Sequence, residues 1–401
     1  MNTFEERLRL ESNAWVADGL ITAGTRSALL ARHPAGEGGG RFLAVLAGVG
    51  GSLVLAGVCL LIGSHWEQIG DWVKLGGLVA LLTGAYVAGW RCQVAPGRYP
   101  RIGDACFMVG AGLFMAGIAL VSQIYHLNSR PASGVMLWWL GIVAVPWMTR
   151  SKGAQFLSMA ALLTWLGMEL HTADSWIALA GPNYDWWWHE FYSFIAVMTL
   201  LCLAVWLAGL AGRGTRHEVF AGLHEKWGAG LTCLGLYWLG FVRHEWARQH
   251  IHLGFNWSPL ALAGVLVLVA GWGAWRQSRR ELRGLAPWLC LSLVPMVAVC
   301  LGWEIGDAGW LWSALAWGAL FVLNLFMVHV GLATGRTGWV NLGIGFIALN
   351  IITRYFDLFG TLLQGGIFFV VSGVIVLVLG IGLERKRRAL LRTLRNREEA
   401  V

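Results

Sequence analysis

The stretch FYSFIAVMTLLCLAVWLAGLA, residues 191–211, runs for twenty-one residues without a charged side chain. About 20 apolar residues in a helix are enough to span the hydrocarbon core of a bilayer. The rest of the chain repeats this pattern, because 57% of its 401 residues are hydrophobic and only 13% are charged. Soluble domains carry about 25% charged residues. The composition therefore excludes a water-soluble protein and predicts an all-α, polytopic transmembrane bundle.

Similar apolar runs along the chain predict about twelve membrane spans. The expected spans are residues 42–64, 72–90, 103–125, 134–148, 153–171, 191–211, 227–242, 258–275, 285–301, 309–333, 338–352 and 361–383. The runs at 134–148, 227–242 and 338–352 are short, so ten or eleven spans remain open.

The positions of the basic residues predict the orientation of these spans. With twelve spans, 25 of the 30 Lys and Arg residues fall on one side of the membrane. The opposite side holds the other five, which are Lys74, Arg130, Arg243, Arg248 and Arg354. Cytoplasmic loops are the ones enriched in Lys and Arg. We therefore expect both termini to be cytoplasmic.

Polar segments flank the expected bundle, so we divide the chain into residues 1–41, 42–383 and 384–401. The first segment predicts a cytoplasmic helical hairpin. An amphipathic helix that carries Phe4 and Trp15 would end at Asp18-Gly19, and a second helix would run from Thr22 to about His33. The last segment begins with Glu384-Arg-Lys-Arg-Arg388, a basic run suited to anionic lipid headgroups.

Motifs for cofactors and metals are missing from the sequence. The seven Cys residues form no CxxC pair, and His244-Glu-Trp-Ala-Arg248 lacks the second His of a HExxH zinc motif. We expect no cofactor, no metal, no assigned catalytic residue and no nucleic-acid partner. The lipid bilayer is the expected partner.

Polar side chains gather instead at the expected outer ends of the spans. Gln123 and His126 lie one helical turn apart, as do Arg354 and Asp357. A charged group at a membrane boundary needs a polar partner, so these side chains are expected to meet in one outward-facing pocket. The candidate substrate-binding residues are Gln123, Tyr125, His126, Arg354, Asp357, Glu304, His65 and Glu67. Structural pairing between helices is the alternative explanation.

Two polar residues lie within the tenth expected span. Asn324 and His329 are five residues apart in residues 309–333. Ionisable groups at membrane depth are candidates for function. Hydrogen bonding between helices and a role in proton or substrate transfer both fit them.

Several motifs resemble one family of bacterial membrane proteins. They are Trp15 … Gly19-Leu-Ile-Thr22, Gln123-Ile-Tyr-His126, Asn341-Leu-Gly, Arg354-Tyr-Phe-Asp357, Gly373 and Leu383-Glu-Arg-Lys-Arg-Arg388. Over nearly the whole chain the sequence is similar to the domain of unknown function number twenty-one fifty-seven. The resemblance implies a multi-pass protein of the bacterial inner membrane. It implies no established activity.

Three classes of function are compatible with these features. The preferred hypothesis is permease-like handling of a small or lipid-linked molecule through the outward-facing polar pocket. A non-catalytic sensor, assembly factor or scaffold is the first alternative. A membrane-embedded enzyme that acts on a lipid-linked or periplasmic substrate is the second.

Overall fold

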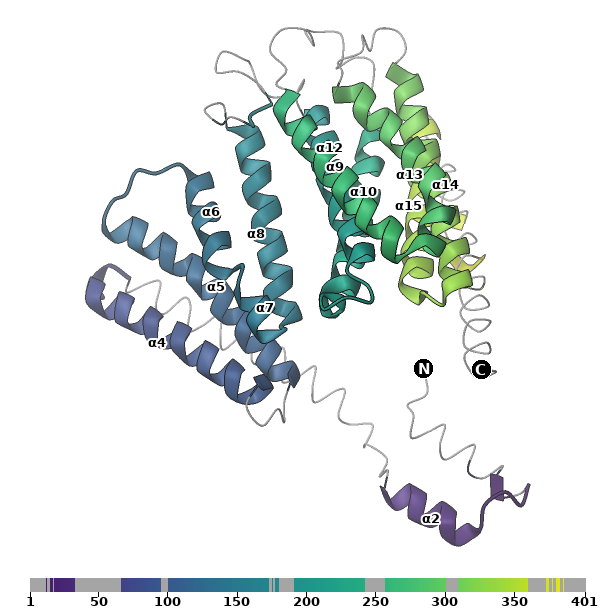
Figure 1. The fold of residues 1–401 in the computed structure, drawn as a ribbon, viewed down its shortest axis with the longest axis horizontal. Helices are drawn as coiled ribbons and strands as arrows, with labels where there is room; N and C mark the ends of the chain where they lie inside the picture. The colour runs from purple at the N-terminus through teal and green to yellow at the C-terminus, as the bar shows by residue number, and fades with distance from the viewer. Residues whose placement is uncertain are drawn as a thin grey trace. The chain divides into compact units, whose positions relative to one another are not determined.

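The structure is a computed structural model in which the described residues form helices and no strand (Figure 1). The described residues are 12, 15–16, 18–32, 66–94, 100–172, 175, 177–179, 191–241, 257–300, 309–359, 373–374, 377, 380–382 and 385. They contain twelve α-helices, one short 3-10 helix and one π-helical turn. The chain divides into two compact units, Met1–Lys74 and Leu75–Val401.

The first unit contains helix α2 (Ala23–Arg32) and the 3-10 helix η1 (Trp66–Gln68). The Thr22 hydroxyl oxygen accepts a hydrogen bond from the backbone N–H of Thr25 at 3.1 Å and caps the start of α2. Gly19 precedes it with a φ of 73°, a backbone conformation that favours glycine. The expected second N-terminal helix is therefore present. Most of the expected first helix, and hence the hairpin, lies outside the described residues.

The remaining helices follow from residue 71 onward. They are α4 (Asp71–Gly89), the π-helical turn η2 (Trp90–Val94), α5 (Pro100–Ile124), α6 (Pro131–Ile142), α7 (Val145–Thr149), α8 (Lys152–His171), α9 (Phe191–Ala211), α10 (Glu218–Leu239), α12 (Trp257–Gln277), α13 (Arg279–Cys300), α14 (Gly309–Thr334) and α15 (Thr337–Phe359). Each expected span from 72–90 to 338–352 coincides with one of these helices or, at 134–148, with the pair α6 and α7.

Six helical segments of the described residues are long and apolar enough to cross a membrane. They are Asp71–Gln93, Pro100–Ile124, Pro131–Thr149, Ser193–Ala211, Ser258–Gln277 and Ser313–Thr334. A helical protein with several candidate spans is thus confirmed. The total of twelve stays a prediction, because residues 42–64 and most of 361–383 lie outside the described ranges.

The second unit has two hydrophobic cores. The smaller core joins α5, α6 and α8 through Ala111, Ile142 and Ala161. The indole N–H of Trp138 donates to the carbonyl oxygen of Ala111 at 2.8 Å and ties α6 to α5. The larger core is built by α9, α10, α12, α13, α14 and α15 around the fully buried Trp206. Figure 1 shows these two groups of helices on either side of α8.

Helix α8 belongs to both cores. Ala161 packs in the smaller core, whereas Leu163, Leu166 and Leu170 pack against the larger one. Its N-terminus is held by Asp104 of α5, which accepts hydrogen bonds from the Ser151 hydroxyl at 2.6 Å and from the backbone N–H of Gly153 at 3.0 Å. A carboxylate at a helix N-terminus also complements the helix dipole. Helix α8 is therefore fixed to the smaller group and meets the larger group along one apolar edge.

Candidate functional site

Three of the expected outer-face residues lie at the end of α5. Gln123, Tyr125 and His126 are all exposed, and the Tyr125 side chain is 58% exposed. His126 has a φ of 49°, so the backbone leaves the helix there. The structure places these residues on a surface turn.

Arg354 lies near the end of α15 and contacts a different part of the bundle. Its guanidinium donates to the carbonyl oxygen of Gly240, the residue that follows α10. The same group lies 4.6 Å from the ring centre of Phe241 and 5.9 Å from that of Trp317. A cation at the C-terminal end of a helix is favoured by the helix dipole. One polar partner of Arg354 is therefore a backbone carbonyl at the end of α10.

The structure does not bring the end of α5 together with Arg354. Figure 1 shows α8, α9 and α10 between α5 and α15. The reason is that α5 packs on α6 and α8, whereas α15 packs on α14 and α10. Glu67 is exposed in the first unit. His65, Glu304 and the side chain of Asp357 lie outside the described residues, so their role stays a prediction.

The two polar residues of α14 have different surroundings. Asn324 is fully buried, and its amide donates to the carbonyl oxygen of Leu320 at 2.8 Å. The Cys233 thiol of α10 contacts the Asn324 oxygen at 3.7 Å. His329 is exposed on the same helix. Asn324 therefore links α14 to α10 inside the core, as expected for hydrogen bonding between helices.

A large apolar pocket lies between α8, α9 and α10. Its volume is about 760 Å³. The lining residues are Leu163, Thr164, Gly167, Met168 and His171 of α8, Phe194, Ile195, Met198, Thr199 and Cys202 of α9, and Leu231, Leu234, Gly235 and Trp238 of α10. Ligand sites of this volume are mostly apolar with a few polar groups, and here Thr164, Thr199 and His171 supply them.

A second, small pocket lies further along the same helices. Its volume is about 580 Å³. The lining residues are Trp147 of α7, Leu162, Leu163 and Leu166 of α8, Leu201, Ala204, Val205, Ala208, Ala211 and Gly212 in and after α9, Thr215 and His217 of the following loop, Ala221 and His224 of α10, and Leu266, Val269 and Ala270 of α12. The polar lining residues Thr215, His217 and His224 gather at the end of this pocket that is nearest the loop between α9 and α10.

The two pockets follow one another along a seam, which we define as the contact of α8 with α9 and α10. Leu163 lines both pockets. On α10, the lining residues Ala221, His224, Leu231 and Trp238 follow helical spacing, so the two pockets share one face of that helix. The side chain of Leu163 is thus shared between the walls of the two pockets.

One polar contact crosses the seam beside the small pocket. The side-chain nitrogens Nε2 of Gln155 and Nε2 of His224 lie 2.9 Å apart, which joins α8 to α10. Apolar contacts also cross it, among them the rings of Phe156 and Trp227, whose centres lie 4.8 Å apart, and leucines of α8 that pack against the larger core. Apolar packing therefore forms a large part of the contact between the two groups of helices.

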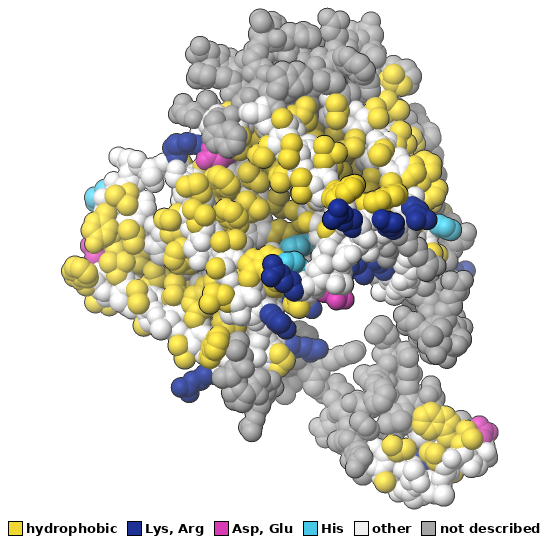
Figure 2. All heavy atoms as spheres, in the orientation of Figure 1, with side chains coloured by type: hydrophobic (Ala, Val, Ile, Leu, Met, Phe, Trp, Pro, Cys, Tyr) yellow, Lys and Arg dark blue, Asp and Glu magenta, His cyan; other side chains and the backbone are white. Residues whose placement is uncertain are grey.

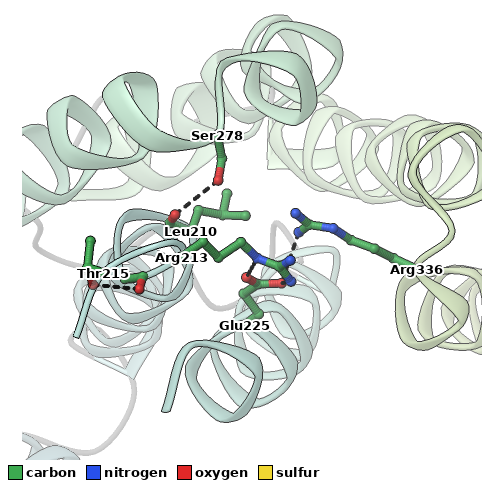
Figure 3. A network of polar contacts seen from close by, with 7 residues as sticks. Leu210, Arg213, Thr215, Glu225, Ser278 and Arg336 are labelled. Atoms are coloured by element: carbon green, nitrogen blue, oxygen red, sulfur yellow. Dashed lines mark hydrogen bonds and ion pairs between the residues drawn. The ribbon is translucent and has the colours of Figure 1, made fainter. Parts of the chain in front are cut away.

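A buried carboxylate lies at the same end of the bundle. The Glu225 side chain is 3% exposed, and two arginines bind it (Figure 3). Arg213 donates from both Nε and Nη2, with Nη2 2.6 Å from Oε2, and Arg336 donates from Nη1 at 3.0 Å. Paired donation of this kind is the strong form of an ion pair. The network joins α10 to the loop after α9 and to the turn between α14 and α15.

No local pattern in the sequence predicts this network, because Arg213 and Arg336 stand in two expected loops that are far apart along the chain. A usable signal was present, because Glu225 stands directly before the expected span 227–242. A carboxylate at that depth requires a cationic partner. Within the described residues, no group of three or more His, Cys, Asp or Glu side chains is arranged to hold a metal ion.

Comparison with known proteins adds one relationship. No curated protein and no solved structure matches the chain. One family model matches a part of the chain that ends at the start of α8. The motifs quoted in the sequence analysis resemble a family over a longer range, as far as residue 388. Residues 13–155 of the chain match the family described as "Predicted membrane protein (DUF2157)".

Proposed function

We propose that the chain is a permease-like protein that moves a lipid-linked or otherwise amphiphilic small molecule along the seam. The observation that carries this proposal is the pair of pockets, about 760 and 580 Å³, that follow one another along α8, α9 and α10 and share Leu163. Two apolar cavities that line adjoining stretches of the same three helices and share a lining residue offer space for an amphiphilic molecule along the seam.

The walls of the pockets support an amphiphilic substrate rather than an ion. Both pockets are lined mainly by Leu, Ala, Val, Met and aromatic side chains. The few polar groups are Thr164, Thr199 and His171 in the large pocket and Thr215, His217 and His224 in the small one. An ion would have to shed its hydration shell against such walls at a high cost in free energy. A molecule with an apolar body and a polar end loses nothing by entering them.

The orientation of the path follows from the distribution of charge. The small pocket ends at the loop with Arg213 and Arg216, which belongs to the basic side of the twelve-span arrangement. We therefore assign the small pocket to the cytoplasmic half of a bacterial inner membrane and the large pocket to the outer half. This path replaces the outward-facing polar pocket as the proposed route.

Leu163 provides the test. The purified protein would be placed in vesicles that contain phosphatidylglycerol with a fluorescent NBD label. Dithionite added outside the vesicles should then also destroy the fluorescence of labelled lipid that starts in the inner leaflet, because the protein moves that lipid to the outer leaflet. Leu163→Trp should reduce this loss to the level of protein-free vesicles, because the larger indole takes up space where the two pockets share a wall. Leu268→Trp is the matched control, since Leu268 is 73% exposed on α12 and lines neither pocket.

Three results would contradict the proposal, and the first two concern the wild type. One is wild-type protein that moves the labelled lipid no faster than empty vesicles do. Another is an equal rate for wild type and Leu163→Trp, which would place the route elsewhere. A change confined to Leu268→Trp would likewise assign transport to the outer surface of α12.

A further inference from the structure

We infer that the small pocket is a binding site for an anionic phospholipid, with an acyl chain along its apolar wall and the phosphate between Arg216 and Arg276. This inference rests on the proposed function, because it names the class of substrate that the small pocket would hold. Its evidence is separate, because it comes from the groups at the mouth of that pocket and not from the passage at Leu163.

The small pocket is polar at one end only. Its wall along α9 and α12 is apolar, and its polar residues Thr215, His217 and His224 gather toward the loop between α9 and α10. The shape therefore matches a molecule that is apolar along its length and polar at one end. A phospholipid in the bilayer has this form, and its headgroup lies at the level of helix ends.

Arg216 brings a positive charge to that mouth. Its Nε donates to Nε2 of His217 at 3.3 Å, and the His217 ring packs edge-on against Trp147 with ring centres 5.0 Å apart. The arginine is thereby held beside two residues that line the pocket. A guanidinium held through Nε presents its two Nη groups, which are the donors that bind phosphate in pairs.

Arg276 approaches the same mouth from α12. Val269 lines the pocket, and Arg276 follows seven residues later, two turns along the same face. Its guanidinium lies 4.8 Å from the ring centre of Trp272. The Ser278 hydroxyl donates to the carbonyl oxygen of Leu210 at 3.0 Å, which fixes the end of α12 beside the end of α9. Both arginines therefore lie at the end of the bundle where the polar lining residues of the small pocket gather.

The charge of this edge favours an anionic lipid over a neutral one. Figure 2 shows an apolar face bordered by a row of Lys and Arg side chains with His beside it. Basic pockets between membrane helices on the cytoplasmic side bind anionic headgroups. A zwitterionic lipid would fill the apolar wall equally well but would gain less from two arginines.

Equilibrium binding tests the inference without any transport step. Delipidated full-length protein in detergent would be titrated with phosphatidylglycerol and with phosphatidylcholine of the same chain length, and bound lipid would be counted by native mass spectrometry. Phosphatidylglycerol should bind more tightly. Arg216→Gln and Arg276→Gln should each weaken its binding roughly fivefold and leave phosphatidylcholine unchanged. Arg91→Gln is the control, because Arg91 is exposed in η2, away from the pocket lining.

A second pair of variants distinguishes lipid binding in the small pocket from attraction of lipid to the surface charge. Val269→Trp should weaken the binding of both lipids, because the indole takes up space beside the apolar wall of the pocket. Leu268→Trp should leave the binding of both lipids unchanged. Equal affinity for the two lipids, or unchanged affinity in both arginine variants, would overturn the inference. Displacement of phosphatidylglycerol by millimolar inorganic phosphate would also overturn it, since the site would then take free phosphate.

The two proposals fail in distinguishable ways. If phosphatidylglycerol binds selectively but Leu163→Trp transports normally, the lipid site stands and the transport route is wrong. If the arginine variants bind normally but Leu163→Trp blocks transport, the route stands and the lipid site is wrong.

Discussion

Glu225 illustrates, at the scale of one residue, what hydropathy cannot detect. The charged residues Glu218, Glu225 and Lys226 interrupt the apolar run, so the sequence predicts a span that starts at 227. The helix begins nine residues earlier, at Glu218. The buried carboxylate is tolerated because Arg213 and Arg336 neutralise it from two other segments. Those partners come from positions 12 and 111 residues away, which no local pattern reveals.

Substitution of Glu225 should therefore destabilise the fold. Glu225→Ala leaves two arginines beside each other without their carboxylate, at an expected cost of roughly 3–5 kcal/mol in the free energy of unfolding. Denaturant unfolding of the protein in detergent would measure it. Glu218→Ala is the control on the same helix, because Glu218 is exposed, and should change stability by less than about 0.5 kcal/mol. Equal stability of the two variants would show that the network contributes nothing.

At the scale of the element, the sequence predicts the presence of a helix more reliably than it predicts the residue at which the helix ends. The expected span 338–352 ends before Arg354, yet α15 continues to Phe359 because Gly240 supplies a carbonyl partner for that arginine. The expected span 134–148 is divided into α6 and α7, with Pro146 in the first turn of α7. Proline is well tolerated in a first helical turn, since the missing N–H would have no partner there.

Close packing of α9 against α10 depends on glycines that the sequence did not single out. A Cβ atom built on Gly228 would lie 2.4 Å from the backbone nitrogen of Trp206, and one on Gly235 would lie 1.8 Å from the Thr199 hydroxyl. Small residues allow helices in membranes to approach in this way. Glycine spacing alone does not identify such positions: Gly112 is followed four residues later by Ala116, yet a Cβ on Gly112 would make only an ordinary contact at 3.8 Å.

Gly228→Ala should consequently separate α9 from α10. The added methyl group meets backbone atoms of Trp206, which cannot rotate away, so we expect a loss of roughly 1–3 kcal/mol in unfolding free energy. Gly222→Ala on the same helix is the matched control. A Cβ there meets nothing within 4 Å, and the change should stabilise the helix by roughly 0.5–1 kcal/mol. Unfolding curves that move in the same direction for both variants would contradict the packing argument.

At the scale of the whole molecule, composition predicts the class of fold but not the site. Apolar runs and the spacing of charges locate helices, since both are local properties of the chain. The pockets depend on how α8 leaves the smaller core and meets α9 and α10 along three leucines. Residues such as Leu163 and Val269 differ in no visible way from other apolar residues of a span. Their position beside a cavity follows from packing between distant helices.

The orientation of the whole chain is testable through the same charge distribution that assigns the small pocket to the cytoplasm. Reporter fusions after residues 130, 180 and 250 should be active in the periplasm, and fusions after 96, 151 and 220 should be active in the cytoplasm. The reason is that cytoplasmic loops retain Lys and Arg, and 25 of the 30 fall on one side of twelve spans. The twelve-span arrangement has five spans before α9, so an even number there would reverse the later fusions relative to the earlier ones. Two or more reversed loops would contradict the twelve-span arrangement, and a periplasmic signal after residue 220 would move Arg216 away from the cytoplasmic leaflet and its anionic lipids.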